Sequence, residues 1–178
     1  MSSGVPCVES TMKLCEYTSI YEKECLAIFD SNTPQYFAPQ ECETFQGFLN
    51  RLAAPYSYFV IRDAGEKIIA CGGIKLEPSN LLAKLRWDMV TAELHHQSIG
   101  TFLTLSRLYR ICQSSEIRVV SLHTSQHSYQ FYEKMGFVVQ HIIPEGIVPG
   151  MDEYFMKLNL DEDRRHVIAS FAKQASLI

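Results

Sequence analysis

The sequence lacks the cysteine pairs, long apolar runs and targeting segments that mark several large classes of protein. None of its six cysteines forms a CxxC pair, although metal ligands normally come in such closely spaced pairs. We therefore expect free thiols of a reducing compartment and no metal. No apolar run approaches the ~20 residues that span a bilayer. The start, MSSGVPCVES, has no basic segment followed by an apolar one, so we expect no secretory signal, no membrane partner and a cytoplasmic protein.

Positive charge is also scarce, because the formal net charge is -4 and the pI is about 5.9. A chain of this charge has no overall basic field to recruit nucleic acid. The motifs GxxxxGK[ST], GxSxG and HExxH are missing, which removes the usual support for kinase-like, hydrolase-like and zinc-protease functions. What is present is ordinary: 178 residues, 47% hydrophobic and 20% charged, enough for one globular domain with a full core.

Hydrophobic periodicity predicts strands interleaved with helices. Strands are expected at residues 12–17, 57–63, 67–78, 82–91, 116–123, 137–143 and 153–160. Helices are expected at residues 19–32, 39–54, 98–113 and within 124–137. The order β-α-α-β-β-β-α-β-α-β-β predicts a single α/β domain with a mixed sheet over residues 12–160. Residues 1–11 are interpreted as a loose leader, 144–152 as a loop, and 161–178 as a helical tail with Val167, Ile168 and Phe171 on one side.

Two junctions carry the features from which a function can be argued. After the expected strand at 82–91, a helix begins near Ser98-Ile99-Gly100-Thr101. Its first amides have no internal partner, and a small glycine-containing turn lets a phosphate approach them. The simpler alternative is an ordinary helix with Ser98 as its N-cap. Strand alternation places Leu85, Trp87 and Met89 on one face of residues 82–91, and Arg86, Asp88 and Val90 on the other.

The second junction is FYEKMGF. Helical spacing puts Ser128, Phe131, Tyr132 and Met135 on one face. Gly136 suits the left-handed position that ends a helix, and the apolar Phe137 suits the position that folds back on it. The inward side chain of Tyr132 then carries a hydroxyl into the core, where it either satisfies a buried backbone group or takes part in chemistry.

Together, HHQSIGT and FYEKMGF resemble the motifs of the GNAT acetyltransferase superfamily, over about residues 12–160. The resemblance implies the single-domain GNAT fold with two splayed parallel strands at its centre, and acetyl-CoA as cosubstrate. The family's phosphate loop, Q/R-x-x-G-x-G/A, falls on residues 95–100, where His95 and Ser98 depart from the pattern. The second motif, N-x-x-A-x-x-F-Y-x-K-x-G-F, falls on 125–137, where Ser125 replaces the Asn.

The resemblance also implies roles for individual residues. It places a bulge at Met89, Val90 and Thr91, whose backbone would bind the pantetheine arm. The remaining cofactor-binding residues would be His95, His96, Gln97, Ser98, Ile99, Gly100, Thr101, Ser125 and Tyr132. Tyr132 would protonate the departing CoA thiolate.

For the base that deprotonates the amine, Asp88 is the first candidate and His123 the second. A near-neutral reference pKa suits His123 to this work. Each has a structural alternative: Asp88 as an ion-pair partner of Arg86 or as a carboxylate at a strand edge, and His123 as a satisfied histidine at a strand end.

The acceptor site is expected between the first two helices and the last hairpin, with Tyr36, Phe37 and Tyr154 as substrate-binding residues. These aromatic side chains, with Glu145, Asp152 and Glu153, would suit a small cationic amine, or the acids are simply solvated. We therefore expect an N-acetyltransferase, monomeric or homodimeric, that acts on a small primary amine by a direct ternary-complex mechanism. The alternatives are acetylation of a protein lysine or N-terminus, and a non-catalytic acyl-CoA-binding module.

Overall fold

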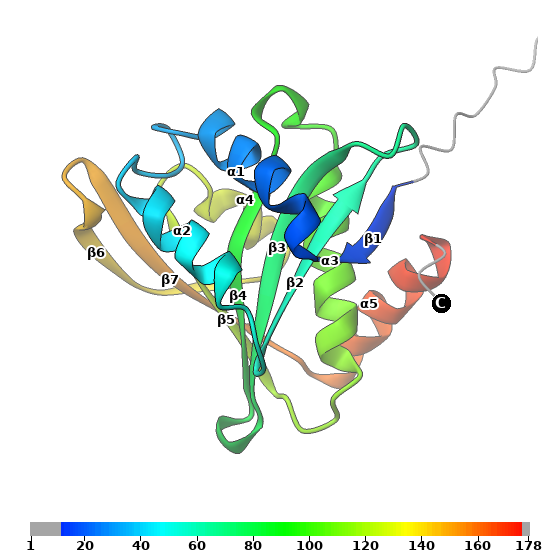
Figure 1. Ribbon diagram of the computed structural model, residues 1–178. Coiled ribbons are helices and arrows are strands. Elements are labelled where there is room, and N and C mark those ends of the chain that lie inside the picture. Colours follow the sequence, from blue (N-terminus) through cyan, green and yellow to red (C-terminus); the bar gives the residue numbers. More distant parts are fainter. Residues whose placement is uncertain (1–11, 176–178) are drawn as a thin grey trace, which may run out of the picture.

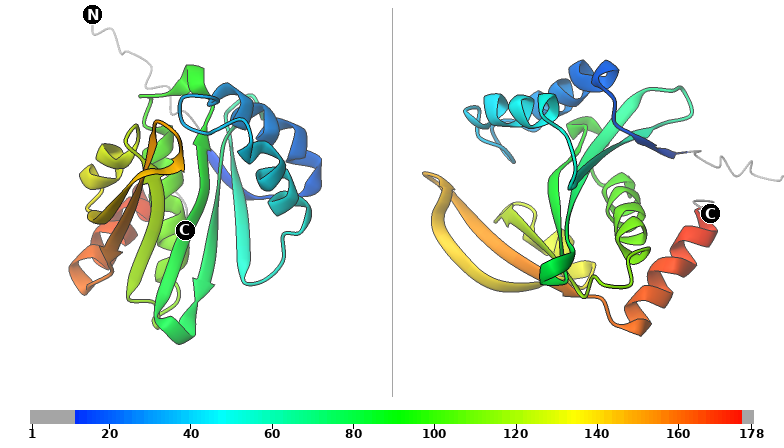
Figure 2. Two further views of the ribbon diagram at one scale, coloured as in Figure 1. Left: turned by 90° about the vertical axis from the view of Figure 1, so that its left-hand side faces the viewer. Right: turned by 60° about the horizontal axis from the view of Figure 1, so that its bottom comes forward.

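The computed structural model describes residues 12–175, and the expected leader 1–11 lies outside the described residues. A central sheet is covered by helices on both of its faces (Figures 1 and 2). Helices α1 (Glu22–Ser31) and α2 (Glu41–Asn50) cover one face, and α3 (Ile99–Cys112) and α5 (Glu162–Gln174) lie on the other. We call these the α1/α2 face and the α3 face. The short helix α4 (Tyr129–Lys134) also packs on the α3 face.

Seven strands form one mixed sheet in the order β1-β2-β3-β4-β5-β7-β6. The strands are β1 (Lys13–Glu16), β2 (Tyr56–Arg62), β3 (Ile68–Glu77), β4 (Leu82–Val90), β5 (Val119–Ser125), β6 (Val138–Val148) and β7 (Met151–Asn159). All neighbours are antiparallel except β4 and β5, which are parallel and connected through α3. The observed order of strands and helices and the mixed sheet confirm the predicted fold class and element order. The prediction succeeded because the hydrophobic periods of the sequence match these elements.

The parallel strands β4 and β5 separate soon after they begin. Their pairing extends only from Leu82↔Val119 to Lys84↔Ser121. Beyond these pairs, β4 continues to Val90 and β5 to Ser125 without a shared ladder. The predicted splay at the centre of the sheet is therefore present, and it leaves backbone groups of β4 facing a gap.

A bulge interrupts β4 in the stretch that borders this gap. Cys71 pairs with Met89 and Gly73 with Arg86, so two residues of β4, Trp87 and Asp88, face the single Gly72 of β3. Trp87 has a φ of 53°, which is uncommon for a bulky residue and belongs to the local kink of a bulge. The bulge was expected at residues 89–91 and lies instead just before them.

The bulge overturns the expected alternation along β4. Leu85 packs with residues of α3, whereas Trp87 and Met89 pack with α1 and α2. The prediction that these three residues share a face is therefore wrong. The extra residue places Asp88 on the α3 face, opposite Arg86.

Two further expectations need correction near the chain end. Residues 144–148, predicted as part of a loop, continue strand β6, with irregular pairing between Ile143 and Val148. In α5 the inward residues are Ile168, Phe171 and Ala172, whereas Val167 is 62% exposed. The helix packs on α3, with the Phe102 and Phe171 rings 6.0 Å apart, so the predicted tail packs against the rest of the domain.

Candidate active site

The gap between β4 and β5 is bordered at one end by the loop that starts α3. The first turn of α3 contains Ile99, Gly100 and Thr101, whose amides have no carbonyl partner within the helix. The predicted start of this helix is confirmed. Ser98 occupies the N-cap position, but its φ is 62° and its hydroxyl makes no capping bond. The expectation of an ordinary serine cap is therefore wrong, and these amides are left for another partner.

Gly100 joins this loop to α4. A Cβ at Gly100 would lie 3.4 Å from Cζ of Phe131 and 3.8 Å from Cγ2 of Val90. These are ordinary contact distances, so alanine fits here, while a larger side chain would displace Phe131, the neighbour of Tyr132. His96 and Gln97 of the same loop are exposed. The glycine therefore lets the phosphate-loop candidate and the helix that carries Tyr132 lie against each other.

Backbone groups of Val90 and Thr91 differ in what they have left to offer a ligand. Thr91 N donates to Ile69 O at 2.9 Å, so by the alternation of an antiparallel ladder the N–H and C=O of Val90 point toward the gap. The carbonyl of Val90 accepts from Asn32 Nδ2 at 2.8 Å and lies 3.1 Å from His95 Nε2. This leaves the N–H of Val90 as the group that faces the gap.

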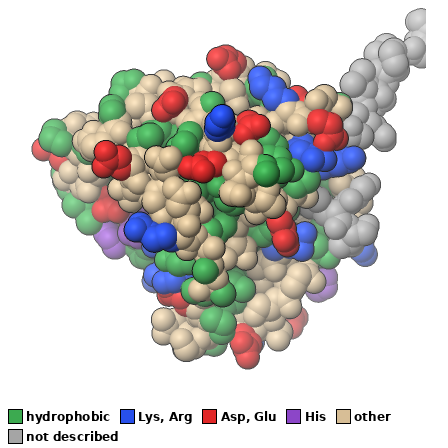
Figure 3. All heavy atoms as spheres, viewed as in Figure 1, with side chains coloured by type: hydrophobic (Ala, Val, Ile, Leu, Met, Phe, Trp, Pro, Cys, Tyr) green, Lys and Arg blue, Asp and Glu red, His purple; other side chains and the backbone are tan. Residues whose placement is uncertain are grey.

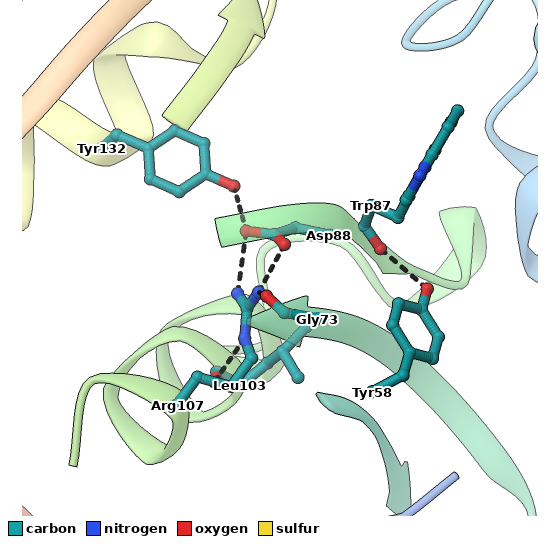
Figure 4. A network of polar contacts seen from close by, with 7 residues as sticks. All are labelled: Tyr58, Gly73, Trp87, Asp88, Leu103, Arg107 and Tyr132. Atoms are coloured by element: carbon teal, nitrogen blue, oxygen red, sulfur yellow. Dashed lines mark hydrogen bonds and ion pairs between the residues drawn. The ribbon is translucent and has the colours of Figure 1, made fainter. Parts of the chain in front are cut away.

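A chain of three buried or half-buried polar side chains lies at the gap (Figure 4). The hydroxyl of Tyr132 donates to Asp88 Oδ2 at 2.9 Å. Both carboxylate oxygens of Asp88 also accept from the guanidinium of Arg107, at 2.8 Å for the Nη2–Oδ2 bond. Figure 4 shows the side chains of Asp88 and Trp87 pointing in different directions from β4, as the bulge requires. The ion-pair partner of Asp88 is therefore Arg107 and not Arg86.

Burial makes this network energetically important. Arg107 is fully buried, and its Nε and Nη1 also donate to Leu103 O and Gly73 O. Burial alone would lower the pKa of Arg107, but the nearby Asp88 carboxylate outweighs this effect and raises the pKa above its ordinary value. Removing one partner of such a buried pair typically costs roughly 3–5 kcal/mol. Room for the guanidinium comes from Gly72, where a Cβ would lie 2.8 Å from Nη1 of Arg107.

Tyr132 stays a phenol in this surrounding. Burial raises the pKa of Tyr132 well above its ordinary value of 10, and the adjacent Asp88 carboxylate raises it further, against a smaller opposing effect of Arg107. The inward position of Tyr132 is as predicted, and so is the helix end behind it, where Gly136 has a φ of 92°. Its hydroxyl contacts a carboxylate.

His123 lies on the opposite face of the sheet from Tyr132. Val120 and Leu122 of β5 pack on the α3 side, so by alternation His123 projects from the α1/α2 face. Its Nδ1 lies 2.7 Å from Glu153 Oε1 of β7, and the His123 side chain is 46% exposed. Ser125, expected near the pantetheine arm, is buried, and its Oγ accepts from His127 N at 3.3 Å.

The expected acceptor residues fall in different places. Tyr36 packs edge-on against His95 and His127, with ring centroids 5.1 and 6.1 Å away. Phe37 lies between Phe29 and Trp87 on the α1/α2 side. Tyr154, by contrast, stacks on Tyr129 of α4 at 4.4 Å and packs against the core on the α3 face. The structure thus brings Tyr36 and Phe37 to one side of the sheet and Tyr154 to the other.

A groove of about 510 Å³ lies between the α1–α2 loop and the β6–β7 turn. It is lined by Pro34, Gln35, Ala38, Pro39, Gln40, His127, Val148, Pro149, Gly150 and Met151. Met151 precedes Glu153 by two residues on β7, so by alternation both belong to the α1/α2 face. Over this face acidic and basic side chains are interspersed, and neither sign forms a broad patch (Figure 3).

The comparisons with known proteins agree with this geometry. The family described as "Acetyltransferase (GNAT) domain" matches residues 30–160. The chain belongs to the GNAT acetyltransferase family. Its enzyme class is therefore that of an acyltransferase, and GNAT enzymes use acetyl-CoA as cosubstrate. A comparison with curated protein sequences gives no match.

Solved GNAT structures share the fold at low sequence identity. One is a protein from Desulfovibrio desulfuricans assigned to the GNAT family, with a TM-score of 0.70, 16% identity, and coverage of 83% of this chain and 98% of that chain. A GCN5-related N-acetyltransferase from Kribbella flavida has a TM-score of 0.70 at 14% identity, and the match covers 84% of this chain and 98% of that chain. A spermidine N-acetyltransferase chimera of the Vibrio cholerae enzyme and hSSAT has a TM-score of 0.69 at 16% identity, covering 84% and 96%.

Within residues 12–175 of this GNAT chain, no group of three or more His, Cys, Asp or Glu side chains is arranged to hold a metal ion. Among the described helices, none is both long and apolar enough to cross a membrane. Sequence reasoning missed Arg107 as a member of the site. The signal was available, because Arg107 is four residues from both Leu103 and Ile111 and so interrupts the apolar stripe of its helix.

Proposed function

We propose that this protein transfers the acetyl group of acetyl-CoA to a primary amine of a small molecule, in a complex that holds both substrates at once. The observation that carries the proposal is the Tyr132 hydroxyl, buried at the splay between β4 and β5 and oriented by a carboxylate. A structural tyrosine of a core would instead satisfy a backbone carbonyl, as Tyr58 does with Trp87 O at 2.9 Å.

The residues at the gap fit acetyl-CoA. The first-turn amides of α3 and the N–H of Val90 are donors at the gap, and the first turn of a helix favours a phosphate. Gly100 and the small Ser98 keep the loop narrow. When bound, acetyl-CoA would supply an activated acetyl group and a thiol leaving group. The backbone amides would hold its phosphates and pantetheine arm, so the departures at His95 and Ser98 leave the main donors in place.

Tyr132 is proposed to give its proton to the departing sulfur. Its raised pKa keeps the phenol protonated through the neutral range, and a thiolate of ordinary pKa near 8.5 needs a proton or a hydrogen bond as it leaves. Both carboxylate oxygens of Asp88 accept from the guanidinium of Arg107, which fixes the carboxylate in place. The fixed carboxylate in turn sets the direction of the Tyr132 O–H. In this proposal Asp88 and Arg107 are positioning residues.

The groove supports a small acceptor. A volume of about 510 Å³ between two chain segments is that of a small-molecule pocket. Gln126, next to the lining residue His127, holds the β6–β7 turn in place, because it donates to Gly150 O at 2.8 Å and accepts from Asp152 N at 2.9 Å. A protein lysine would need a longer open groove. The spermidine N-acetyltransferases among the similar structures are in line with an amine acceptor.

Direct transfer is favoured by the state of the thiols. Burial raises the pKa of Cys112, with Arg165 opposing, and a hydrogen bond with Cys71 together with burial raises the pKa of Cys25. A protonated thiol is a poor nucleophile, so an acyl-cysteine intermediate at Cys112 or Cys25 is disfavoured. Holding both substrates together can instead supply roughly 7–11 kcal/mol of the barrier.

Calorimetric titration with acetyl-CoA tests the first step of the proposal. We expect micromolar binding that Gly100→Ala retains and Gly100→Trp abolishes, because only the larger side chain must displace Phe131. Binding would justify a screen of amines that detects the CoA thiol released. With an amine that reacts, double-reciprocal plots of the initial rate against both substrates should give intersecting lines. No binding to the wild-type protein would overturn the proposal in favour of an interaction module, and parallel lines would overturn direct transfer.

A further inference from the structure

We propose that His123, oriented by Glu153, is the general base that takes the proton from the acceptor amine. This inference rests on the proposed function and names the group that activates the nucleophile. It places the base on the α1/α2 face of the sheet and the acid, Tyr132, on the α3 face, so that the two act on either side of the gap.

The position of His123 along β5 is the first argument. Pairing between β4 and β5 ends at Lys84↔Ser121. His123 follows Ser121 by two residues, so it projects from the same face and lies in the part of β5 that borders the gap. The groove residue Met151 and the partner Glu153 are on that face too. An acceptor in the groove would therefore approach the gap from the side that carries this imidazole.

The contact with Glu153 is the second argument. Nδ1 of His123 lies 2.7 Å from Glu153 Oε1. A carboxylate accepts this bond only from a protonated Nδ1, so the neutral imidazole carries its lone pair on Nε2. The His123 side chain is 46% exposed, so the ring is open to an incoming acceptor. The carboxylate also stabilises the imidazolium that forms when a proton is taken up.

The ring of His123 is also supported by its neighbours across the sheet. His123, Phe155 and His141 form one cross-strand row, with ring centroids 4.8 and 5.0 Å from Phe155. The charged or titratable groups on this face of the neighbouring strands are His141 of β6, Glu153 and Lys157 of β7, and Lys84 and Arg86 of β4. Of these, Glu153 is the one bonded to His123.

The carboxylate of Asp88, the other base candidate, is already occupied by hydrogen bonds. Its two oxygens accept from Arg107 and Tyr132, and its side chain is only 13% exposed. Taking up a proton would remove the counter-charge of a fully buried guanidinium. The carboxylate therefore serves the tyrosine.

The proton balance of the step is simple. Nε2 of His123 takes one proton from the ammonium group, which frees the nitrogen lone pair. The new C–N bond forms as the C–S bond breaks, and Tyr132 supplies the proton that the sulfur requires. The nitrogen still carries two protons when the C–N bond forms, and it loses the second one to solvent, from which the phenol of Tyr132 is restored. The exposed imidazolium returns its proton to water. In total the ammonium loses two protons, of which one ends on the CoA thiol and one in solvent, so no oxidant or reductant is needed.

The test compares kcat/KM across pH for wild type, His123→Gln, Glu153→Gln and Asp88→Asn, with His141→Gln as the matched control. His141 also contacts Phe155 but has no carboxylate partner within the described residues. We expect His123→Gln to lower kcat/KM about 10²–10⁴-fold at neutral pH. The imidazole limb of its profile should vanish, and the rate should rise with pH until the acceptor amine itself deprotonates. Glu153→Gln should weaken the same limb, and Asp88→Asn should leave it in place.

Two further measurements separate the possible failures. Hydroxylamine, which is neutral near pH 7, should be acetylated with a much smaller loss in His123→Gln, because it needs no prior deprotonation. Nitrogen NMR of the free protein should show His123 protonated at Nδ1 in wild type and a mixture of tautomers in Glu153→Gln. Unchanged kcat/KM and pH limb in His123→Gln would overturn the inference alone, whereas a wild-type enzyme that binds acetyl-CoA but acetylates no amine would overturn the proposed function with it.

Discussion

At the scale of single residues, Tyr132 combines a buried phenol with a charged neighbour. We expect Tyr132→Phe to lower kcat about 10²-fold, the usual size of a lost proton-transfer group. The KM for acetyl-CoA should change little, because the ring and its packing remain. Since burial and Asp88 raise the pKa of Tyr132, no alkaline limb belonging to this phenol should appear below pH 10 in the wild type.

Steady-state kinetics with Tyr129→Phe as the control will check this expectation. Tyr129 lies on the same helix but stacks on Tyr154 and does not bond Asp88. A Tyr132→Phe enzyme with full turnover at its pH optimum would contradict a role in thiolate departure.

The sequence predicts some of these residues and misses others for physical reasons. The inward position of Tyr132 follows from helical spacing, a local property. The pairing of Asp88 with Arg107 joins residues on two elements, 19 positions apart, and depends on a bulge that strand alternation alone does not reveal. The bond between His123 and Glu153 spans 30 positions, and it depends on the register of β5 against β7.

At the scale of elements, a cluster of charged side chains connects β3 and β4 next to the turn of their hairpin. Glu77 bonds Lys75 at 2.6 Å and Lys84 at 3.1 Å, and these two lysines, Lys75 first, lower the pKa of Glu77 to about 2. A carboxyl with a lowered pKa contributes stability that is fully present above its unfolded value and is lost as the pH falls toward 2.

Glu77→Gln should therefore lower the melting temperature at pH 7 and have progressively less effect below about pH 4. Thermal unfolding of both proteins at several pH values measures this. Glu66→Gln, which removes the exposed pair with Arg62 in the β2–β3 turn, is a control for charge alone. A difference between wild type and Glu77→Gln that stays constant down to pH 2 would refute the linkage.

Element boundaries were predicted well where period and turn residues agree, as in β2, β3 and α3. They were predicted poorly in β6, where Pro144 and Gly146 read as a loop. Pairing with the next strand, β7, on both sides of the irregular stretch, at Ile143↔Glu153 and Val148↔Met151, keeps the segment in the sheet despite those residues, because the hairpin ladder outweighs local turn preference.

At the scale of the whole molecule, α5 completes the α3 layer. Ile168 is 1% exposed and adjacent Val167 is 62% exposed, so the two test burial on the same helix. Ile168→Ala should lower the free energy of unfolding by about 2–5 kcal/mol, and Val167→Ala should change it by less than about 0.5 kcal/mol. Urea denaturation followed by circular dichroism would measure both.

Equal effects of the two substitutions would show that α5 does not pack on α3 in solution. The sequence placed both residues inward because adjacent apolar positions of a helix cannot be ranked by period alone. Tertiary contacts determine which face of α5 is buried. Phe171 packs against Phe102, and Arg165 donates to the carbonyls of Cys112 and Ile117.

The short pairing of β4 with β5 gives the molecule a mechanical character. The sheet consists of two plates, β1–β4 and β5–β7–β6, whose shared seam is three residue pairs at one end. The apolar side of α3 is the second attachment, since Leu108 and Ile111 belong to the same core as residues of both plates. Twisting of one plate against the other is resisted least at the open end of the seam. Any molecule lodged there acts as a brace across the two plates.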